Sequence, residues 1–430
     1  MRILVASFLL LLLFACCHLS TQKIHAIINP SAVESIEKVL SADDMRGRAT
    51  FTPDIERAAD YIEGQFKAAG LQTWNGTNSY RQPFVMVRAS PISAAATLDG
   101  ELQPTGRVFA VSSSASLSVD ENSGYEKAYI KAGSNIGVEV SHYVHEKKNY
   151  LVVMDTSYTS FFPRLQRFGR QQFKSDHHVI FVLGSGVPTH FSIQVQQQVT
   201  ESKLANVVGI LPGKSKKNEF VIFSGHYDHL PVGKPDNKGD SIFNGANDDA
   251  SGTTAVIMLA NYFSKLKNNE RTLVFATFTA EEIGEFGSQY FSQQFDPAAV
   301  MAMFNIEMIG TESKWGTNSA YITGYEKTDM GKILEKNLTG SGFTFYPDPY
   351  PQQQLFYRSD NATLARQGVA AHTISTSKMD SEKYYHTRGD EIGTLDMNNM
   401  ARIIQSIAIS SRTIIEGKDT PSRVDTTQLR

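Results

Sequence analysis

The chain has 430 residues, of which 41% are hydrophobic and 20% are charged, and its formal net charge at pH 7 is -3. This length exceeds one ordinary core and predicts roughly two or three domains of a soluble globular protein. The balanced charge, without a basic stripe, excludes an electrostatic surface of the kind that binds nucleic acid.

The first residues have the layout of a secretory signal. Arg2 precedes an apolar run over residues 3–15 that is too short to cross a membrane comfortably. Residues 1–15 also resemble a bacterial lipoprotein signal, in which Cys16 would become residue one and anchor the chain in a membrane; plain secretion is the alternative. We therefore expect an exported protein, which would be periplasmic, an outer-membrane lipoprotein or secreted. Because Cys16 and Cys17 are the only cysteines, we expect no disulfide in the mature chain.

Two regions of different character follow the signal. Residues 24–85 are predicted to form helices that pack on a catalytic domain, since "DIERAADYIEGQFKAAG" places apolar residues on one face before Gly70. Residues 86–204 are richer in Ser, Val and Gln and contain short runs such as "YLVVMD" and "HHVIFVLG" without a clear helical repeat. This second region predicts an inserted, mainly β domain.

Strands and helices alternate over residues 205–415. The apolar segments "ANVVGIL", "EFVIFSG", "RTLVFATF", "AVMAMFNI" and "VAAHTIST" are predicted strands. The predicted helices cover about residues 252–267, 281–294, 329–338 and 397–414. This pattern predicts an α/β fold whose mixed sheet is mostly parallel, with helices on both faces. Residues 416–430 form a polar tail that we expect to be frayed.

Polar side chains able to bind a metal or move a proton follow the predicted strands. They are His226 and Asp228 after the second strand, Asp248 and Asp249 in "NGANDDASG", Glu281 and Glu282 after the third strand, Glu307 after the fourth, and Tyr385, His386 and Asp390 in "YYHTRGDE". Ligands of open α/β sheets bind at the carboxyl ends of the strands. Two histidines and at least three carboxylates at this edge are suited to zinc, and the lack of a thiol favours an open catalytic site.

Each of these residues also has an ordinary explanation. A histidine can be hydrogen-bonded in the core, an aspartate can cap a helix, and a glutamate can form a salt bridge at a strand end. The segment from Thr279 to Glu282 matches a capping box at a helix start. It is the set taken together that favours chemistry over these structural roles.

The spacing of two pairs suggests roles. Residues two apart in an extended chain share a face, so Asp228 can orient His226 by accepting a hydrogen bond from its second ring nitrogen. Adjacent residues point in different directions, so Glu281 and Glu282 are not expected to bind the same ion. One can bind metal while the other takes a proton from the water that the metal activates.

Five segments in this order resemble the co-catalytic zinc aminopeptidases of metallopeptidase family 28. The segments are "SGHYDH", "NGANDDASG", "TAEEIGEFGS", "FNIEMIG" and "YYHTRGDE". Glutamate carboxypeptidase, glutaminyl cyclase and the transferrin receptor are members or relatives of this family. The resemblance covers residues 205–415, and residues 40–72 are similar to the family's N-terminal helices. Residues 86–204 stand where many members carry a protease-associated domain.

The resemblance implies a site with two zinc ions. Asp248 would bridge them, with His226 and Glu307 on one ion and Glu282 and His386 on the other.

The same resemblance assigns the remaining roles. Glu281 would be the general base that deprotonates the bridging water and later protonates the leaving amine. Asp228 would orient His226, and Tyr385 would help to polarise the scissile carbonyl. Glu307 departs from the family pattern, which most often has aspartate here, and its longer side chain bears on metal affinity and preference more than on the reaction class.

Three functions are compatible with these residues. The first is an aminopeptidase that hydrolyses N-terminal residues from peptide substrates. The second keeps the scaffold but changes the reaction to that of a carboxypeptidase, a dipeptidase or glutaminyl cyclase; Arg358 and Arg388 are candidate partners for a terminal carboxylate. The third is a non-catalytic binding protein, which has no need of a complete ligand set together with Glu281.

Overall fold

The computed structural model describes residues 23–429, so the expected signal and Cys16 lie outside the described residues. The chain forms two compact units: one contains the residues up to Gln82 and those from Ala205 onward, and the other is Pro83–Leu204. Within residues 23–429, no helix has the length and apolar character needed to span a membrane.

The first unit is built on a mixed sheet with the strand order β15, β14, β16, β13, β11, β12, β10. Strand β11 runs parallel to β12 and β13, and β13 runs parallel to β16, whereas β10 and β14 join the sheet antiparallel to β12 and β16. The strands are β1 Gln72–Thr73, β10 Phe191–Leu211, β11 Lys216–His226, β12 Arg271–Phe278, β13 Val300–Ile306, β14 Ser319–Ile322, β15 Thr344–Pro347 and β16 Ala371–Ser375.

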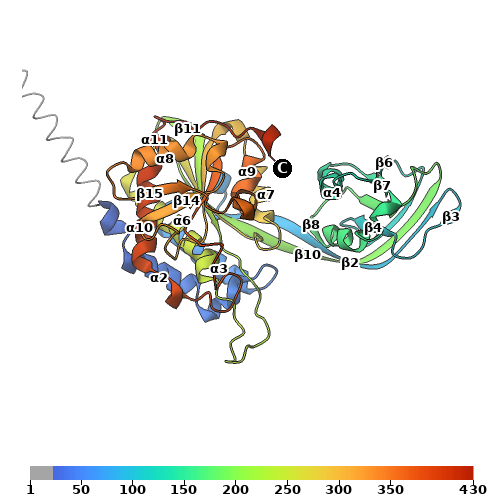
Figure 1. The fold of residues 1–430 in the computed structure, drawn as a ribbon, viewed down its shortest axis with the longest axis horizontal. Helices are drawn as coiled ribbons and strands as arrows, with labels where there is room; N and C mark the ends of the chain where they lie inside the picture. Colours follow the sequence, from blue (N-terminus) through green and yellow to red (C-terminus); the bar gives the residue numbers. More distant parts are fainter. Residues whose placement is uncertain (1–22, 430) are drawn as a thin grey trace, which may run out of the picture. The chain divides into compact units, whose positions relative to one another are not determined.

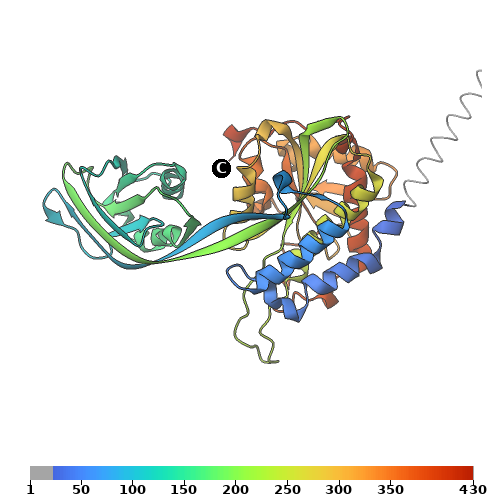
Figure 2. The ribbon, with the colours of Figure 1, turned by 180° about the vertical axis from the view of Figure 1, so that it is seen from behind.

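Helices cover both faces of this sheet (Figure 1, and from behind in Figure 2). They are α2 Pro30–Leu40, α3 Asp54–Ala68, α6 Ser251–Leu266, α7 Phe286–Ser292, α8 Met330–Leu338, α9 Asn361–Ala365, α10 Met397–Ser410 and α11 Arg412–Ile415. Side chains alternate along each strand. In β12, Leu273 and Phe275 therefore belong to the buried cluster that includes side chains of α2, α3, α6, α8 and α10, while Val274 and Phe278 belong to the cluster that includes side chains of α7 and α9.

The second unit contains a separate four-stranded sheet with the order β4, β9, β7, β6. Strand β7 runs parallel to β6 and β9, and β4 runs antiparallel to β9. Its elements are β2 Arg81–Leu98, β3 Glu101–Leu102, β4 Val108–Val111, β5 Ser116–Asp120, β6 Glu126–Ile130, α4 Ile136–His145, β7 Tyr150–Met154, α5 Phe162–Leu165, β8 Gln171–Phe173 and β9 Val179–Leu183; both β2 and β10 have residues in each unit. Helix α4 connects the parallel strands β6 and β7 and was not predicted. Its sequence, IGVEVSHYVH, is rich in valine, and with Val140 as its one buried residue it lacks the apolar face that marks a packed helix.

Two further sequence-based expectations are wrong. The helix predicted from residue 281 begins only at Phe286, and Glu281 and Glu282 lie in a turn, so Thr279 to Glu282 is not a capping box. The polar tail is not frayed over its described residues. The buried Arg271 donates hydrogen bonds to the Asp419 carbonyl and the Thr420 hydroxyl, and Val424 is 5% exposed.

Candidate active site

The register of the sheet brings the polar strand ends together. His226 is the last residue of β11 and pairs with Phe278, the last residue of β12. Ser224 of β11 pairs with Asn305 of β13, which places Glu307, just beyond β13, at the same edge. Parallel neighbours end at one side of a sheet, so residues that are far apart in sequence meet there.

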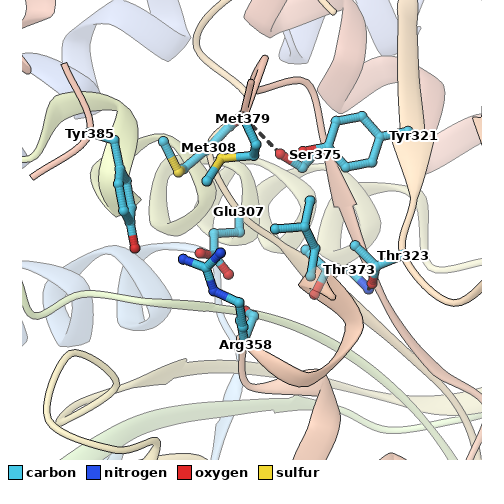
Figure 3. A pocket seen from close by; sticks show the side chains of 11 residues that line it. Glu307, Met308, Tyr321, Thr323, Arg358, Thr373, Ser375, Met379 and Tyr385 are labelled. Atoms are coloured by element: carbon cyan, nitrogen blue, oxygen red, sulfur yellow. Dashed lines mark hydrogen bonds between the residues drawn. The ribbon is translucent and has the colours of Figure 1, made fainter. Parts of the chain in front are cut away.

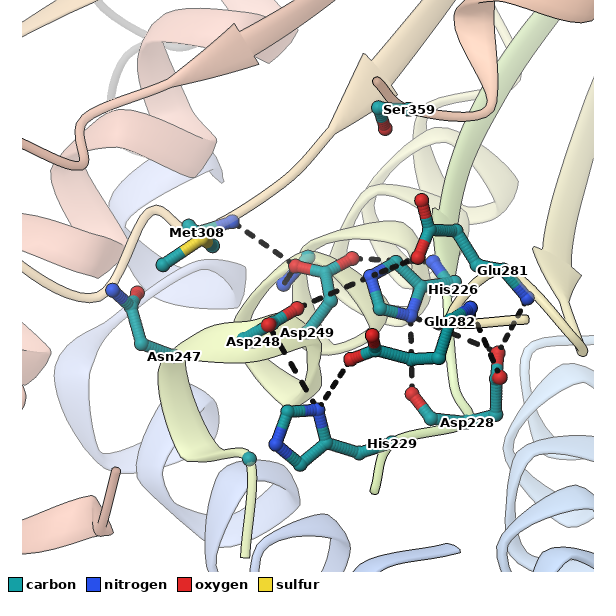
Figure 4. Close-up of polar contacts among 12 residues, drawn as sticks. His226, Asp228, His229, Asn247, Asp248, Asp249, Glu281, Glu282, Met308 and Ser359 are labelled. Carbon is teal, nitrogen blue, oxygen red and sulfur yellow. Dashed lines mark hydrogen bonds and ion pairs between the residues drawn. The ribbon is translucent and has the colours of Figure 1, made fainter. Parts of the chain in front are cut away.

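His226 faces carboxylates from three separate segments (Figure 4). Its Nε2 atom lies 3.3 Å from Asp248 Oδ1 and 3.8 Å from Glu281 Oε2. His226, Asp248 and Glu307 each offer a ligand atom, and these three atoms lie within 4.8 Å of one another. The histidine and Asp248 are almost wholly buried, with 1% of each residue exposed. The three residues form one candidate metal group.

Asp248 also belongs to a second candidate group, with His229 and Glu282. His229 Nδ1 lies 2.7 Å from Glu282 Oε1 and 3.8 Å from Asp248 Oδ2. His386 contacts the same two carboxylates, because its Nε2 lies 3.2 Å from Asp248 Oδ2 and 3.1 Å from Glu282 Oε2. Asp248 is thus shared between two groups, and Glu281 and Glu282 lie on different sides of it.

The structure changes the part assigned to Asp228. His226 Nδ1 is 3.0 Å from the backbone carbonyl of Asp228, whereas the Asp228 carboxylate is 3.7 Å from the same nitrogen. That carboxylate instead accepts hydrogen bonds from the backbone amides of Glu281 at 3.1 Å and Glu282 at 3.4 Å, and from the Thr50 hydroxyl at 2.9 Å. Asp228 therefore orients the histidine through its main chain and fixes the glutamate pair through its side chain.

Two buried aspartates hold the loop that carries Asp248. The Asp390 carboxylate accepts the amides of Asn247 at 2.8 Å and Asp248 at 3.0 Å. The Asp249 carboxylate accepts the amides of His226 and Met308, both at 3.1 Å. Asp249 therefore connects the ends of β11 and β13. Because these carboxylates are occupied by backbone donors, they support the ligand-bearing loops.

The N-terminal segment also takes part, although the sequence suggested only packing for it. The buried Arg48 guanidinium donates to the carbonyls of Tyr227 at 2.8 Å, Asn244 at 2.6 Å and Gly245 at 3.0 Å. Gly245 has a φ of +55°, and a Cβ atom there would lie 2.5 Å from the His229 ring. A glycine is required at this position for His229 to fit beneath the loop.

Burial and charge act on these groups in opposite directions. Burial raises the pKa of Glu307 to about 7 and that of Asp360 to about 8. Burial disfavours a charged His386, yet its contacts with Asp248 and Glu282 raise its pKa to about 10. The pKa of His226 is likewise raised well above its usual range by Glu281 and Asp248, against the effect of burial. The described residues thus concentrate negative charge, which bound protons or cations can neutralise.

The buried atoms of the site fit a metal. Although they lie near opposite charges, His226 Nε2, Asp248 Oδ2 and Glu307 Oε2 are buried and make no hydrogen bond. Imidazole nitrogen and carboxylate oxygen are zinc ligands, and the arrangement leaves room for other ligands since each group has few protein donors. This observation agrees with the donor set expected from the sequence.

A small, partly open cavity lies beside Glu307 (Figure 3). It is lined by Glu307, Met308, Tyr321, Thr323, Leu355, Arg358, Ser359, Thr373, Ser375, Met379 and Tyr385. Tyr385 stacks on the His386 ring, with centroids 3.9 Å apart and an interplanar angle of 21°. Tyr385 therefore contacts His386 of the second candidate group and also lines the cavity.

The structure thus brings together all eight residues that the sequence singled out as site residues. Three contributors were missed, and they are His229, Arg48 and Thr50. Asp390 was noted in "YYHTRGDE", but its support of the loop that carries Asp248 was not predicted. His229 had a signal in the sequence, since it stands three residues after His226 in "SGHYDH". Arg48 and Thr50 had none, because their partners lie about 180 residues or more away along the chain.

His229 can be tested separately from His386. His229→Ala removes an imidazole within 2.7 Å of Glu282, so a zinc ion held at Asp248 and Glu282 should bind about 10- to 100-fold more weakly. A zinc ion held at His226 and Glu307 should be unaffected. Zinc titration against a competing chelator resolves the two affinities, and His177→Ala, which changes an exposed histidine of the other unit, serves as the control. An unchanged zinc affinity would show that His229 contributes nothing to the site.

Residues 206–410 match the model of "Peptidase family M28". A protein described as a probable leucine aminopeptidase from Arthroderma otae is 27% identical over 220 residues, which are 48% of this chain and 56% of that protein. The chain spans about half the length of such curated relatives, as it does for leucine aminopeptidase 1 of Ajellomyces capsulatus.

Solved structures agree over a longer part of the chain. The aminopeptidase from Aneurinibacillus sp. strain AM-1 has a TM-score of 0.54 at 18% identity, over 91% of this chain and 95% of that one. A zinc aminopeptidase from Bacillus subtilis has a TM-score of 0.54 at 16% identity, over 90% and 95%. At these identities the likeness concerns the fold, and it confirms the α/β fold with a mixed sheet that the sequence predicted.

Proposed function

Because the chain belongs to peptidase family M28, we propose that it is a zinc-dependent exopeptidase that removes N-terminal residues from peptides. The observation that carries the proposal is the position of Asp248, which is shared by two groups of metal-binding side chains. Beside them lies Glu281, a carboxylate that belongs to neither group. Ligands and a separate base are the requirements of metal-assisted hydrolysis.

Two zinc ions per chain would use the side chains already described. His226, Asp248 and Glu307 would hold one ion, and Asp248, Glu282 and His386 the other, with His229 against Glu282. When bound, zinc polarises a scissile carbonyl and lowers the pKa of the attacking water. The names of two similar proteins, a zinc aminopeptidase and a probable leucine aminopeptidase, support zinc as the metal and the N-terminus of a peptide as the place of cleavage.

Glu281 is placed to move the proton. Its backbone amide is anchored on Asp228 at 3.1 Å, and its Oε2 atom lies near His226 without forming a close contact. A carboxylate fixed in this way can accept the proton of the attacking water and return it to the departing amine. The two glutamates have different roles, because the adjacent Glu282 contacts His229 and His386.

Tyr385 is placed to act on the substrate. Burial raises the pKa of its hydroxyl above the ordinary range, so the group stays protonated at neutral pH. Stacking against His386 restrains the ring. The hydroxyl can therefore donate a hydrogen bond to the carbonyl oxygen of the bond being cut, which stabilises negative charge that develops there.

A substrate panel tests the proposal. We expect aminoacyl-arylamides and peptides with free N-termini to be cleaved, N-acetylated forms of the same peptides to resist, and activity to be lost on chelation and restored by zinc. The reason is that an aminopeptidase requires a free α-amine. Cleavage of blocked peptides alone would favour the carboxypeptidase or dipeptidase reaction, and cyclisation of N-terminal glutamine without hydrolysis would favour the cyclase reaction.

A further inference from the structure

The cavity beside Glu307 contains one cationic side chain, Arg358, among the residues that line it. In the view of Figure 3, its guanidinium overlaps the Glu307 carboxylate and lies between that group and the Arg358 backbone on one side and the Tyr385 hydroxyl on the other. Its charge acts on Tyr385, where it opposes the rise in pKa caused by burial and nearby carboxylates. Arg358 therefore faces the cavity next to the candidate metal site.

The guanidinium has little to bind within the described chain. Its one polar contact is with Gln353 Oε1 at 3.5 Å, and none of the ion pairs of residues 23–429 involves it. Arg388, the other arginine considered from the sequence, differs in this respect. It donates to the Lys234 carbonyl and lies 4.8 Å from the centre of the Phe243 ring.

Three other polar side chains of the cavity wall already have partners. The Tyr321 hydroxyl donates to the Ser377 carbonyl at 3.0 Å, the Thr373 hydroxyl to Asn361 Oδ1 at 2.8 Å, and the Ser375 hydroxyl to the Met308 carbonyl at 3.3 Å. Met308, Leu355 and Met379 supply apolar walls. A ligand in this cavity would thus find an apolar channel with one planar cation available for new hydrogen bonds.

We propose that this cavity binds a carboxylate of the substrate through Arg358. The guanidinium fork matches a carboxylate with two parallel hydrogen bonds. Glu307 would not be the partner of Arg358, because its carboxylate would bind the metal ion when zinc is present. A loaded site and an arginine are both positive, so an anion between them is favoured. This inference rests on the proposed peptidase function and names a substrate class for it.

The carboxylate can come from either of two sources. It can be the side chain of an N-terminal Glu or Asp, or the α-carboxylate of a dipeptide. Matched substrates distinguish them: Glu-arylamide against the equally sized Gln-arylamide for the first source, and a dipeptide with a free C-terminus against its amide for the second. Leu-arylamide reports the basal reaction.

In the parent protein, we expect kcat/KM for the charged member of one pair to exceed that of its neutral partner about 10-fold or more. Arg358→Gln should reduce this ratio about 10- to 100-fold, the range for a charged hydrogen bond. Arg358→Lys should retain part of it, since charge remains without the fork. An effect of Arg358 on Tyr385 would change the cleavage of all substrates alike and would cancel in this ratio. Zinc content and thermal stability should hardly change.

Arg402→Gln, which removes an exposed arginine of α10, is the matched control and should leave both ratios unaltered. The proposal is overturned if neither charged substrate is preferred, or if the preference survives Arg358→Gln. Failure to cleave any substrate of the panel, Leu-arylamide included, would instead refute the proposed peptidase function. The two failures are therefore separable.

Discussion

We expect Glu281→Gln to lower kcat about 100- to 10,000-fold, the usual contribution of a general acid and base. Glutamine has the same size and keeps the backbone hydrogen bond to Asp228, but its amide cannot accept and return a proton. KM should change little, since the substitution leaves both candidate metal groups intact. Steady-state kinetics on a cleaved arylamide measures the effect.

Glu285→Gln is the matched control for this variant. Glu285 lies in the same turn, pairs with Arg366 at 3.6 Å and belongs to neither candidate metal group. It should retain most of the activity, and both variants should keep their zinc content and melting temperature. If Glu281→Gln retained full activity with zinc bound, Glu281 would not be the proton carrier and the mechanism would be wrong.

We further expect the effect of zinc on stability to grow with pH. At about 1,000 times its Kd, zinc would stabilise the folded protein by about 4 kcal/mol, which corresponds to a rise of roughly 10 °C in melting temperature. The rise should be larger at pH 8 than at pH 5.5, because zinc binds deprotonated ligands.

The metal-free protein should show the opposite trend. The folded-state pKa of Glu307 is about 7, against about 4.3 in an unfolded chain, so the folded state holds a proton that the unfolded state has lost. Stability therefore falls as pH rises through this window. His386, with a folded pKa of about 10 against about 6.5, acts in the same direction from pH 6.5 upward.

Calorimetry with zinc or with a chelator, at a series of pH values, measures both trends. Because the chain has two units, only the transition of the first unit should move. Asp248→Asn removes the ligand shared by both groups and should make this transition insensitive to zinc. A chelated protein with confirmed metal loss and an unchanged melting temperature would contradict the account.

The sheet and the eight site residues were accessible from the sequence because they follow from local patterns. Doubly buried strands such as "RTLVFATF" are continuous apolar runs, and the polar residues that follow them meet at one edge through the register of parallel strands. Helix starts were less accessible. The sequence from Thr279 to Glu282 matches a capping box, but the backbone amides of Glu281 and Glu282 donate hydrogen bonds to the distant Asp228 carboxylate. These tertiary hydrogen bonds hold the segment in a turn, and the helix begins later.

The sequence alone thus determined which ligand-type side chains follow the strands and meet at one edge of the sheet, because residue type and position after a strand are local properties. The tertiary structure decided how those residues are held. Arg48 and Thr50 act through hydrogen bonds to segments far away in the chain, and nothing local marks them. Asp390 stands in a segment that the sequence marks, but its partner Asn247 is 143 residues away. The tertiary structure also decided that Arg358 lines a cavity while Arg388 is engaged elsewhere. The physical reason is that a side chain's partners depend on packing between distant segments, whereas its chemical type does not.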